Sequence, residues 1–348
     1  MTTRPPKGTC GAALSAIARG AASRIAHDPP AAASANRANE GVPTRGAIAA
    51  GLMRGVLPGL QALIINDVKG GVVRAPIVMA IVRVVQALPE EADKLTHVRA
   101  AAIQTTSNAL ASHGPDVRDS AREALIGVAR VVGAREMPQI IAALCTSLRK
   151  GYQLHVLGYT LHAILERVAA DPSTAPGDLD SSVDPLVPIL AEDVMGLAAE
   201  ERKVGKIAAK GKEARKCCSY DSLAILARSV HFSADAAVVS SLVDAVASYV
   251  PSSTSPRVRE RVAEMLRALA RGFLANRTAS PQELLLLVHS LLDAHAPAAS
   301  AGGEGRVAPR EQQRDEQLPE RFPLRSVPYL KYERTNHSEQ TCSASQSI

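Results

Sequence analysis

Two tyrosines and two histidines alternate within residues 148–168, as Tyr152, His155, Tyr159 and His162, at spacings of three, four and three. Side chains of these types could form a catalytic or metal-binding face, since imidazole is a common zinc ligand. On a helix, however, histidines seven residues apart are separated by roughly 10 Å of rise, too far for side-by-side chelation. A zinc site would need further ligands from the fold. The alternatives are packing against the next helix pair and contact with a partner.

The basic segment, which we define as residues 202–216 (RKVGKIAAKGKEARK), is the main charge feature. It holds seven basic residues and one acid, and its net charge of +6 equals that of the whole chain (40 Lys and Arg minus 34 Asp and Glu). Such a segment can lie along a phosphate backbone and release counterions. The alternative is a solvated helix face, because acidic residues stand just before it. The candidate contacts to RNA or an acidic partner are Lys203, Lys206, Lys210, Lys212, Arg215 and Lys216.

The mode of contact follows from the types of residue in the basic segment. No aromatic residue interleaves its lysines, so contact with the phosphate backbone, and not stacking on unpaired bases, is the expected mode.

Motifs of the common enzyme classes are missing from the sequence. It has no glycine-rich loop ending in Gly-Lys-Ser/Thr, no His-Glu-x-x-His and no Gly-x-Ser-x-Gly. Cys217 and Cys218 are adjacent, a spacing that does not suit tetrahedral zinc ligation. Five cysteines without framework spacing favour a reducing compartment. We therefore expect no enzyme, no cofactor, no metal and no small-molecule substrate.

A repeated helical pattern supplies the elements that would position these residues. The runs VRAPIVMAIVRV from Val73 and VRDSAREALIGV from Val117 match at an offset of 44 residues. A third run, VRERVAEMLRAL from Val258, follows 141 residues later, or three steps of 47. This period is typical of HEAT repeats, and the low aromatic content of 3% favours closely packed helices. The prediction is an all-α, HEAT-type α-solenoid of antiparallel helix pairs.

Three regions and several helix starts are predicted. Residues 1–46 form an Ala/Arg-rich lead-in and flexible linker, residues 47–296 the solenoid and residues 297–348 a disordered tail. Helices should begin at Pro115, at Pro256 and after Ser280, where Glu283 completes a capping box. The lead-in also has the composition of a mitochondrial transit peptide, which leaves a mitochondrial location as an alternative. Uninterrupted apolar runs are too short to span a bilayer, so we expect a soluble protein without membrane contact.

Four segments in one order resemble a known family. They are GYQLHVLGYTLHAIL, GDLD at 177–180, MGLAAEERKVGKI from Met195 and EARKCCSYDSLAIL from Glu213. Together they are similar to the HEAT-repeat scaffold family of small-subunit processome component 20, also called down-regulated-in-metastasis. The resemblance extends from about residue 70 to about residue 295 and follows irregular loops, which makes it more specific than the repeat period. Cys217 and Cys218 depart from the small polar or basic residues expected there.

The resemblance implies a nucleolar, non-enzymatic scaffold in small-subunit ribosomal RNA maturation, which braces other processome proteins and pre-ribosomal RNA. It implies no catalytic residues. Members of that family are many times longer, so the chain is expected to be a fragment, an incomplete gene model or a shortened relative. The alternative function is a HEAT-repeat adaptor of the transport or phosphatase-scaffold type that binds protein partners only.

Overall fold

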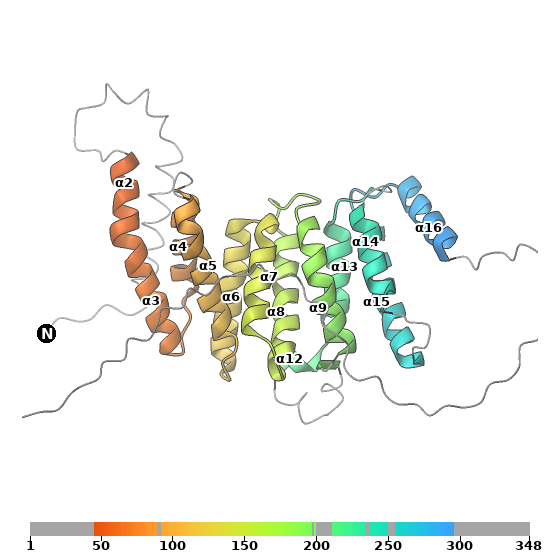
Figure 1. Ribbon diagram of the computed structural model, residues 1–348, viewed down its shortest axis with the longest axis horizontal. Helices are drawn as coiled ribbons and strands as arrows, with labels where there is room; N and C mark the ends of the chain where they lie inside the picture. The colour runs from red at the N-terminus through yellow and green to blue at the C-terminus, as the bar shows by residue number, and fades with distance from the viewer. Residues whose placement is uncertain are drawn as a thin grey trace, which may run out of the picture. The chain divides into compact units, whose positions relative to one another are not determined.

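The computed structural model describes residues 45–88, 92–196, 198–199, 211–233, 237–249 and 255–295, all within the first of two units, Met1–Ala296. Every regular element in these residues is a helix, which confirms the all-α class (Figure 1). The predicted tail 297–348 and residues 1–44 of the predicted lead-in lie outside the described residues. In order, the elements are α2 (Arg45–Gly51), the π-helical η2 (Leu52–Val56), α3 (Leu57–Lys69), α4 (Ala75–Gln86), α5 (Ala92–Ala109), α6 (Pro115–Val132), η4 (Ala134–Glu136), α7 (Met137–Ser147), α8 (Tyr152–Ala169), η5 (Asp180–Ser182), α9 (Val183–Met195), α12 (Lys212–Arg215), α13 (Ser219–Ser229), α14 (Ala237–Ala247), α15 (Pro256–Leu274) and α16 (Pro281–His295).

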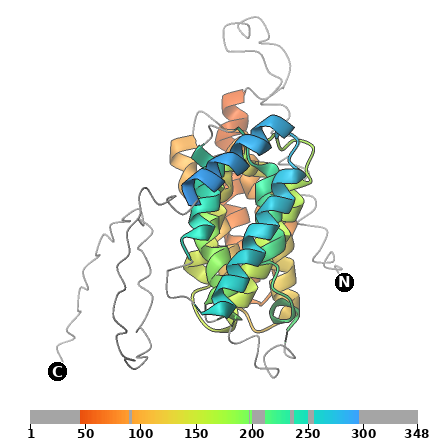
Figure 2. The same cartoon turned by 90° about the vertical axis from the view of Figure 1, so that its right-hand side faces the viewer.

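The helices stack in two layers, seen from the end as two columns in Figure 2. In one layer α4, α6, α8, α13 and α15 each contact the next, and in the other α3, α5, α7, α9 and α14 do the same. Successive helices also contact each other across the layers, for example α3 with α4 and α5 with α6. Each pair buries an apolar face against its neighbours, which is the construction of an α-solenoid. The predicted architecture is confirmed.

The three matching runs of the sequence begin α4, α6 and α15, which all belong to the same layer. Three helix-to-helix intervals separate α6 from α15 in this layer, as predicted, but the intervals differ in their number of residues. α6, α8, α13 and α15 begin at residues 115, 152, 219 and 256, so the steps are 37, 67 and 37 residues and not 47 each. The long step contains the basic segment, which is therefore an insertion into a shorter regular repeat.

The predicted helix starts are those of the structure. α6 begins at Pro115 and α15 at Pro256, where the Ser255 side chain accepts a hydrogen bond from the Val258 amide. Before α16, the Ser280 amide donates to the Glu283 carboxylate at 2.9 Å, and the Glu283 amide donates to Ser280 Oγ at 3.2 Å. This reciprocal pair is the capping box that the spacing of the two residues predicts.

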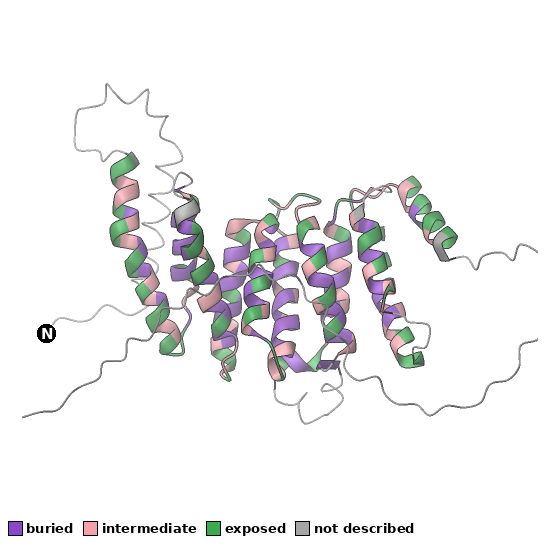
Figure 3. Cartoon of the chain, viewed as in Figure 1, coloured by how far each residue is buried: buried purple, intermediate pink, exposed green. Residues whose placement is uncertain are grey.

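Burial is greatest in the middle of the stack and falls at α16 (Figure 3). Ile81, Leu125 and Leu161 have no exposed surface, whereas Leu285 and Leu292 of α16 are 70% and 65% exposed. Each central helix has neighbours on both sides of its layer, so its apolar face is covered.

The stretch Gly46–Lys69, made of α2, η2 and α3, is a continuous helix of 24 residues. By length and composition it is long and apolar enough to cross a membrane. The sequence expectation considered only uninterrupted apolar runs and missed it, because isolated glycines and polar residues break the run. Leu57, Leu60 and Ile64 of this helix are buried, and α3 contacts both α4 and α5.

Candidate nucleic-acid interface

The structure describes only the second half of the basic segment. Lys203, Lys206 and Lys210 lie outside the described residues. From Gly211 onward the chain forms the single turn α12, on which Lys212 and Arg215 are exposed, and Lys216 follows, also exposed. The three described cations are thus exposed, and two of them already have an acidic neighbour, Asp119 for Lys212 and Asp221 for Lys216.

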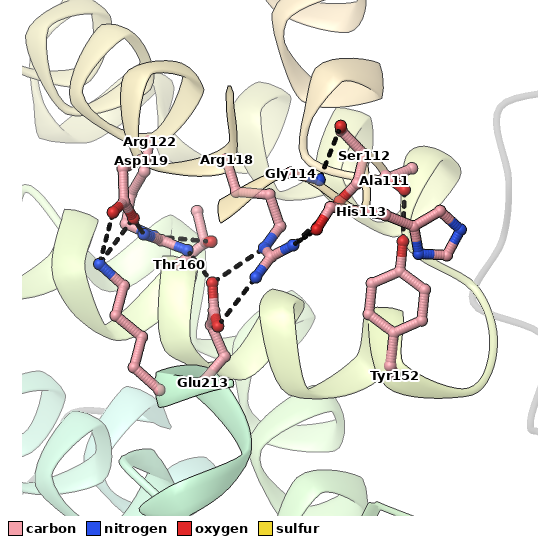
Figure 4. A network of polar contacts seen from close by, with 11 residues as sticks. Ala111, Ser112, His113, Gly114, Arg118, Asp119, Arg122, Tyr152, Thr160 and Glu213 are labelled. Atoms are coloured by element: carbon pink, nitrogen blue, oxygen red, sulfur yellow. Dashed lines mark hydrogen bonds and ion pairs between the residues drawn. The ribbon is translucent and has the colours of Figure 1, made fainter. Parts of the chain in front are cut away.

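The one acid of the basic segment, Glu213, is 3% exposed and holds the segment to α6. Its carboxylate accepts hydrogen bonds from Arg118 Nε at 3.0 Å and Arg118 Nη2 at 3.3 Å, and from Arg122 Nη2 at 3.1 Å (Figure 4). Both arginines are buried as well, and they lie four residues apart on one face of α6. We call Arg118, Arg122 and Glu213 the Glu213 clamp.

The arginines of the Glu213 clamp have further hydrogen-bond partners. Arg118 Nη1 donates to the backbone carbonyls of Ser112 and His113 at 3.0 and 2.9 Å. Arg122 Nε donates to Thr160 Oγ1 of α8 at 3.2 Å. Buried charges are tolerated when they are paired and hydrogen-bonded in this way. The clamp therefore joins α6, α8 and α12 at one point.

The ionisation state of Glu213 follows from two opposing effects. Burial alone would raise the pKa of the Glu213 carboxyl, but hydrogen bonds from Arg118 and the charges of both arginines lower it by more. The net lowering keeps Glu213 a carboxylate at neutral pH, so the ion pairs are complete there.

Lys212 lies beside the clamp and near an aromatic ring. Its Nζ forms an ion pair with Asp119 at 2.7 Å and stands 5.9 Å from the centre of the Tyr159 ring. The guanidinium of Arg122 is 4.7 Å from the same ring. Tyr159 belongs to α8, so an aromatic side chain does accompany the basic segment, from a distant part of the sequence.

A shallow cavity of about 300 Å³ lies between these side chains. Its lining includes Asp119, Arg122, Tyr159 and Lys212, and in total three acids and three bases, so it has no net charge. The cavity therefore gives no electrostatic preference for an anion.

The two ends of the inserted chain meet at Asp193 on α9. Ser219 Oγ, at the start of α13, donates to the Asp193 carboxylate at 2.6 Å. A Cβ at Gly158 of α8 would stand 3.0 Å from that carboxylate, so the glycine leaves it room. The chain that joins α9 to α13 thus starts and ends at Asp193. The Glu213 clamp holds it at a further point, shortly before α13 begins.

The alternating tyrosines and histidines make contacts within this chain. The Tyr152 hydroxyl donates to the Ala111 carbonyl, and His155 is 1% exposed. His162 Nδ1 lies 3.2 Å from Ser222 Oγ of α13, and burial lowers the pKa of His162. Among the described residues no group of three or more His, Cys, Asp or Glu side chains is placed to hold a metal. The use of this face by a partner stays a prediction.

Sequence reasoning missed the Glu213 clamp. It counted Glu213 only as one negative charge, and the run from Val117 was read for its apolar positions. The available signal was the pair Arg118 and Arg122, which flanks the buried stripe Ala121, Leu125 and Val128 of α6. Arginines beside a core stripe can extend to water, so only their burial shows that they need an anion, and the sequence does not show which of 34 acids supplies it.

The two helical layers and the anchored basic insertion define a class: an α-solenoid with a charged insertion between two of its helix pairs. Residues 66–292 match the model of the U3 small nucleolar RNA-associated protein 20 domain. Because the match covers more than half of the chain, this protein belongs to that family.

Two relatives are named U3 small nucleolar RNA-associated protein 20. The relative from Schizosaccharomyces pombe is 31% identical over 231 residues, which are 66% of this chain and 9% of the relative. The relative from Saccharomyces cerevisiae is 28% identical over 218 residues, which are 63% of this chain and 8% of the relative. The chain thus spans less than a tenth of the length of either relative.

Proposed function

We propose that this protein is a non-enzymatic scaffold of the small-subunit processome that supports pre-ribosomal RNA processing and small ribosomal subunit assembly in the nucleolus. Family membership supports the proposal, since the relatives are named for association with the U3 small nucleolar RNA. A stack of helix pairs also suits this role, because it offers a long surface to several partners. The proposed partners are other processome proteins and pre-ribosomal RNA.

The basic segment is the proposed RNA contact. The observation that carries this step is the Glu213 clamp. It holds the C-terminal end of the basic segment, residues 211–216, against α6, while Lys212, Arg215 and Lys216 remain exposed. A held row of cations loses less conformational entropy on binding than a free one. Contact with phosphates would release counterions and make the affinity fall with salt.

The test is the salt dependence of RNA binding by the full chain. We compare wild type with the triple variant Lys203→Glu, Lys206→Glu, Lys210→Glu, titrating a labelled pre-ribosomal RNA fragment at several salt concentrations. The log–log slope should be about 0.7 to 0.9 per neutralised phosphate in the wild type and should be lost in the variant. The matched control reverses Lys69, Arg149 and Lys150, which are exposed on other parts of the solenoid, and should keep the slope.

A different result would support the adaptor alternative. If the triple variant binds RNA with the wild-type slope, or the wild type binds none, the proposed RNA contact is wrong. Purification of the native complex with its RNA and protein companions then decides whether only proteins accompany the chain. Imaging of a fluorescent fusion separates the proposed nucleolar location from the mitochondrial alternative.

A further inference from the structure

The last described helix, α16, has apolar side chains on two adjacent sides. On one side Leu284, Leu287 and Leu291 pack against the core of the solenoid. On the other side lie Leu285, Val288 and Leu292, which are 70%, 52% and 65% exposed. Their spacing of three and four residues is that of a coiled-coil seam, which packs against a second helix. We call Leu285, Val288 and Leu292 the α16 face.

The first described helix, Gly46–Lys69, is open in a different way. Its exposed side carries small residues every three or four positions, namely Gly51, Gly55, Gly59 and Ala62. A Cβ at any of these three glycines would meet nothing within 4 Å. Of the 18 most apolar successive residues of this helix, only 22% are buried. We call the four small residues the small-residue face.

The two faces are complementary in size. Large side chains project from the α16 face, whereas the small-residue face lets a second helix approach closely. Ridges of one helix fit the grooves of another when large side chains meet small ones in this way.

The two helices are also complementary in charge. α16 contains the acids Glu283 and Asp293 and no Lys or Arg. Residues 46–66 contain one cation, the exposed Arg54, and no acid. Two α16 helices would instead place acid beside acid, because a parallel pair brings like residues together and an antiparallel pair brings Glu283 next to Asp293. Charge therefore favours contact between unlike ends of two copies.

We propose that this chain associates head to tail with a second copy of itself, with the α16 face of one copy packed on the small-residue face of the next. Arg54 then lies near Asp293 of α16. A contact between unlike faces leaves one face free at each end, so the association is open-ended. It concerns the assembly of the chain and does not depend on RNA.

The size of α16 sets the strength of the association. Its 15 residues span roughly 22 Å, so the contact buries less than the roughly 800 Å² per partner of a standard interface. We therefore expect a dissociation constant in the micromolar range.

Sedimentation velocity of the full chain from about 1 to about 200 µM is the test. The wild-type sedimentation coefficient should rise with concentration without a plateau at the dimer. Leu285→Glu, Leu292→Glu, the α16 variant, and Gly55→Glu, Ala62→Glu, the small-residue variant, should each stay monomeric because each lacks one face. An equimolar mixture of the two should form dimers and nothing larger, since each variant supplies the face that the other lacks.

The matched control is Leu274→Glu, which changes an exposed leucine of α15 outside both faces and should associate like the wild type. Circular dichroism establishes that each variant is folded. Exchange of the charges refines the orientation of the two helices. Arg54→Asp and Asp293→Arg should each weaken the association about two- to fivefold, and a chain with both changes should recover it.

A wild type that stays monomeric over the whole range overturns the proposal. So does a folded α16 variant that associates like the wild type, because another surface is then responsible. A small-residue variant that dimerises alone replaces head-to-tail contact with pairing of two α16 helices. A mixture of the two variants that forms no dimer also contradicts contact between these two faces.

Discussion

Two joints in this solenoid are built on opposite principles. At the Glu213 clamp, three buried charges connect α12 to α6, across more than 90 residues of sequence. At the joint between α13 and α15, the contact is close and almost without charge. A Cβ at Gly272 would stand 2.4 Å from the Ala224 carbonyl oxygen and 2.6 Å from Ala227 Cβ, so the two backbones nearly touch.

A neutral polar link stands near the ends of α13 and α15. The Asn276 side-chain amide donates to the carbonyls of Ala227 and Val230 at 2.9 and 2.8 Å. These carbonyls stand at the end of α13, where a helix leaves its acceptors unpaired. At this joint two regular helices thus meet through shape and backbone, whereas the inserted segment is joined through charge. Charge pairs are directional, so they hold one irregular segment at one place without a repeated apolar face.

The largest effect is expected at the clamp. Glu213→Ala leaves Arg118 and Arg122 buried without their anion, and breaking a buried pair in this way costs about 3–5 kcal/mol of unfolding free energy. Chemical denaturation of the full chain measures it. Glu123→Ala, an exposed acid on the same helix α6, is the matched control and should change stability by less than about 0.5 kcal/mol.

An equal, small effect of the two substitutions would mean that the clamp does not bear the stability that its burial implies. Glu213→Gln separates charge from shape, because the amide fills the same space but gives the arginines no negative partner. We expect it to fall between wild type and Glu213→Ala.

The α13–α15 joint should respond to volume and not to charge. Gly272→Ala places a methyl group against the Ala224 backbone, which cannot move aside as a side chain can, and should destabilise by about 1–3 kcal/mol. Gly59→Ala in α3, where a Cβ meets nothing within 4 Å, should instead stabilise by up to about 1 kcal/mol through helix propensity. Thermal unfolding of both variants provides the measurement. The same sign at both glycines would contradict the account of close packing.

The regular part of this molecule could be read from the sequence and the irregular part could not. Helix starts at Pro115, Pro256 and Ser280 follow from local chemistry, and the layer of α4, α6 and α15 follows from apolar spacing. Glu213 looks like any acid on a charged turn, because its burial depends on arginines 91 and 95 residues earlier. The aromatic partner of Lys212 was likewise missed, since Tyr159 lies 53 residues before it in the sequence and on another helix.

The smallest effect concerns pH, and it separates the Glu213 clamp from the contact between α8 and α13. Burial lowers the pKa of His162, which contacts Ser222 between α8 and α13, below the ordinary value of 6.5. A lowered folded pKa means that the unfolded chain binds more protons, so the contribution of His162 is complete above 6.5 and is lost as pH falls below it. The pKa of Glu213 is lowered from 4.5, so the contribution of the clamp is complete above 4.5 and is lost only at more acidic pH.

Between about pH 7.5 and about pH 5.5 the wild type should therefore lose slightly more thermal stability than His162→Gln, by at most about 2 °C in Tm, because His162 is only half-buried and solvent screens the effect. Below about pH 4.5 the two proteins should fall together, since both keep Glu213. Glu213→Gln should show a smaller second loss and keep the first, because Asp171 and other carboxyls with lowered pKa values remain. If the Tm of His162→Gln follows that of the wild type from about pH 7.5 to about pH 5.5, the loss of stability comes from other histidines. Protonation of His162 then does not weaken the contact between α8 and α13.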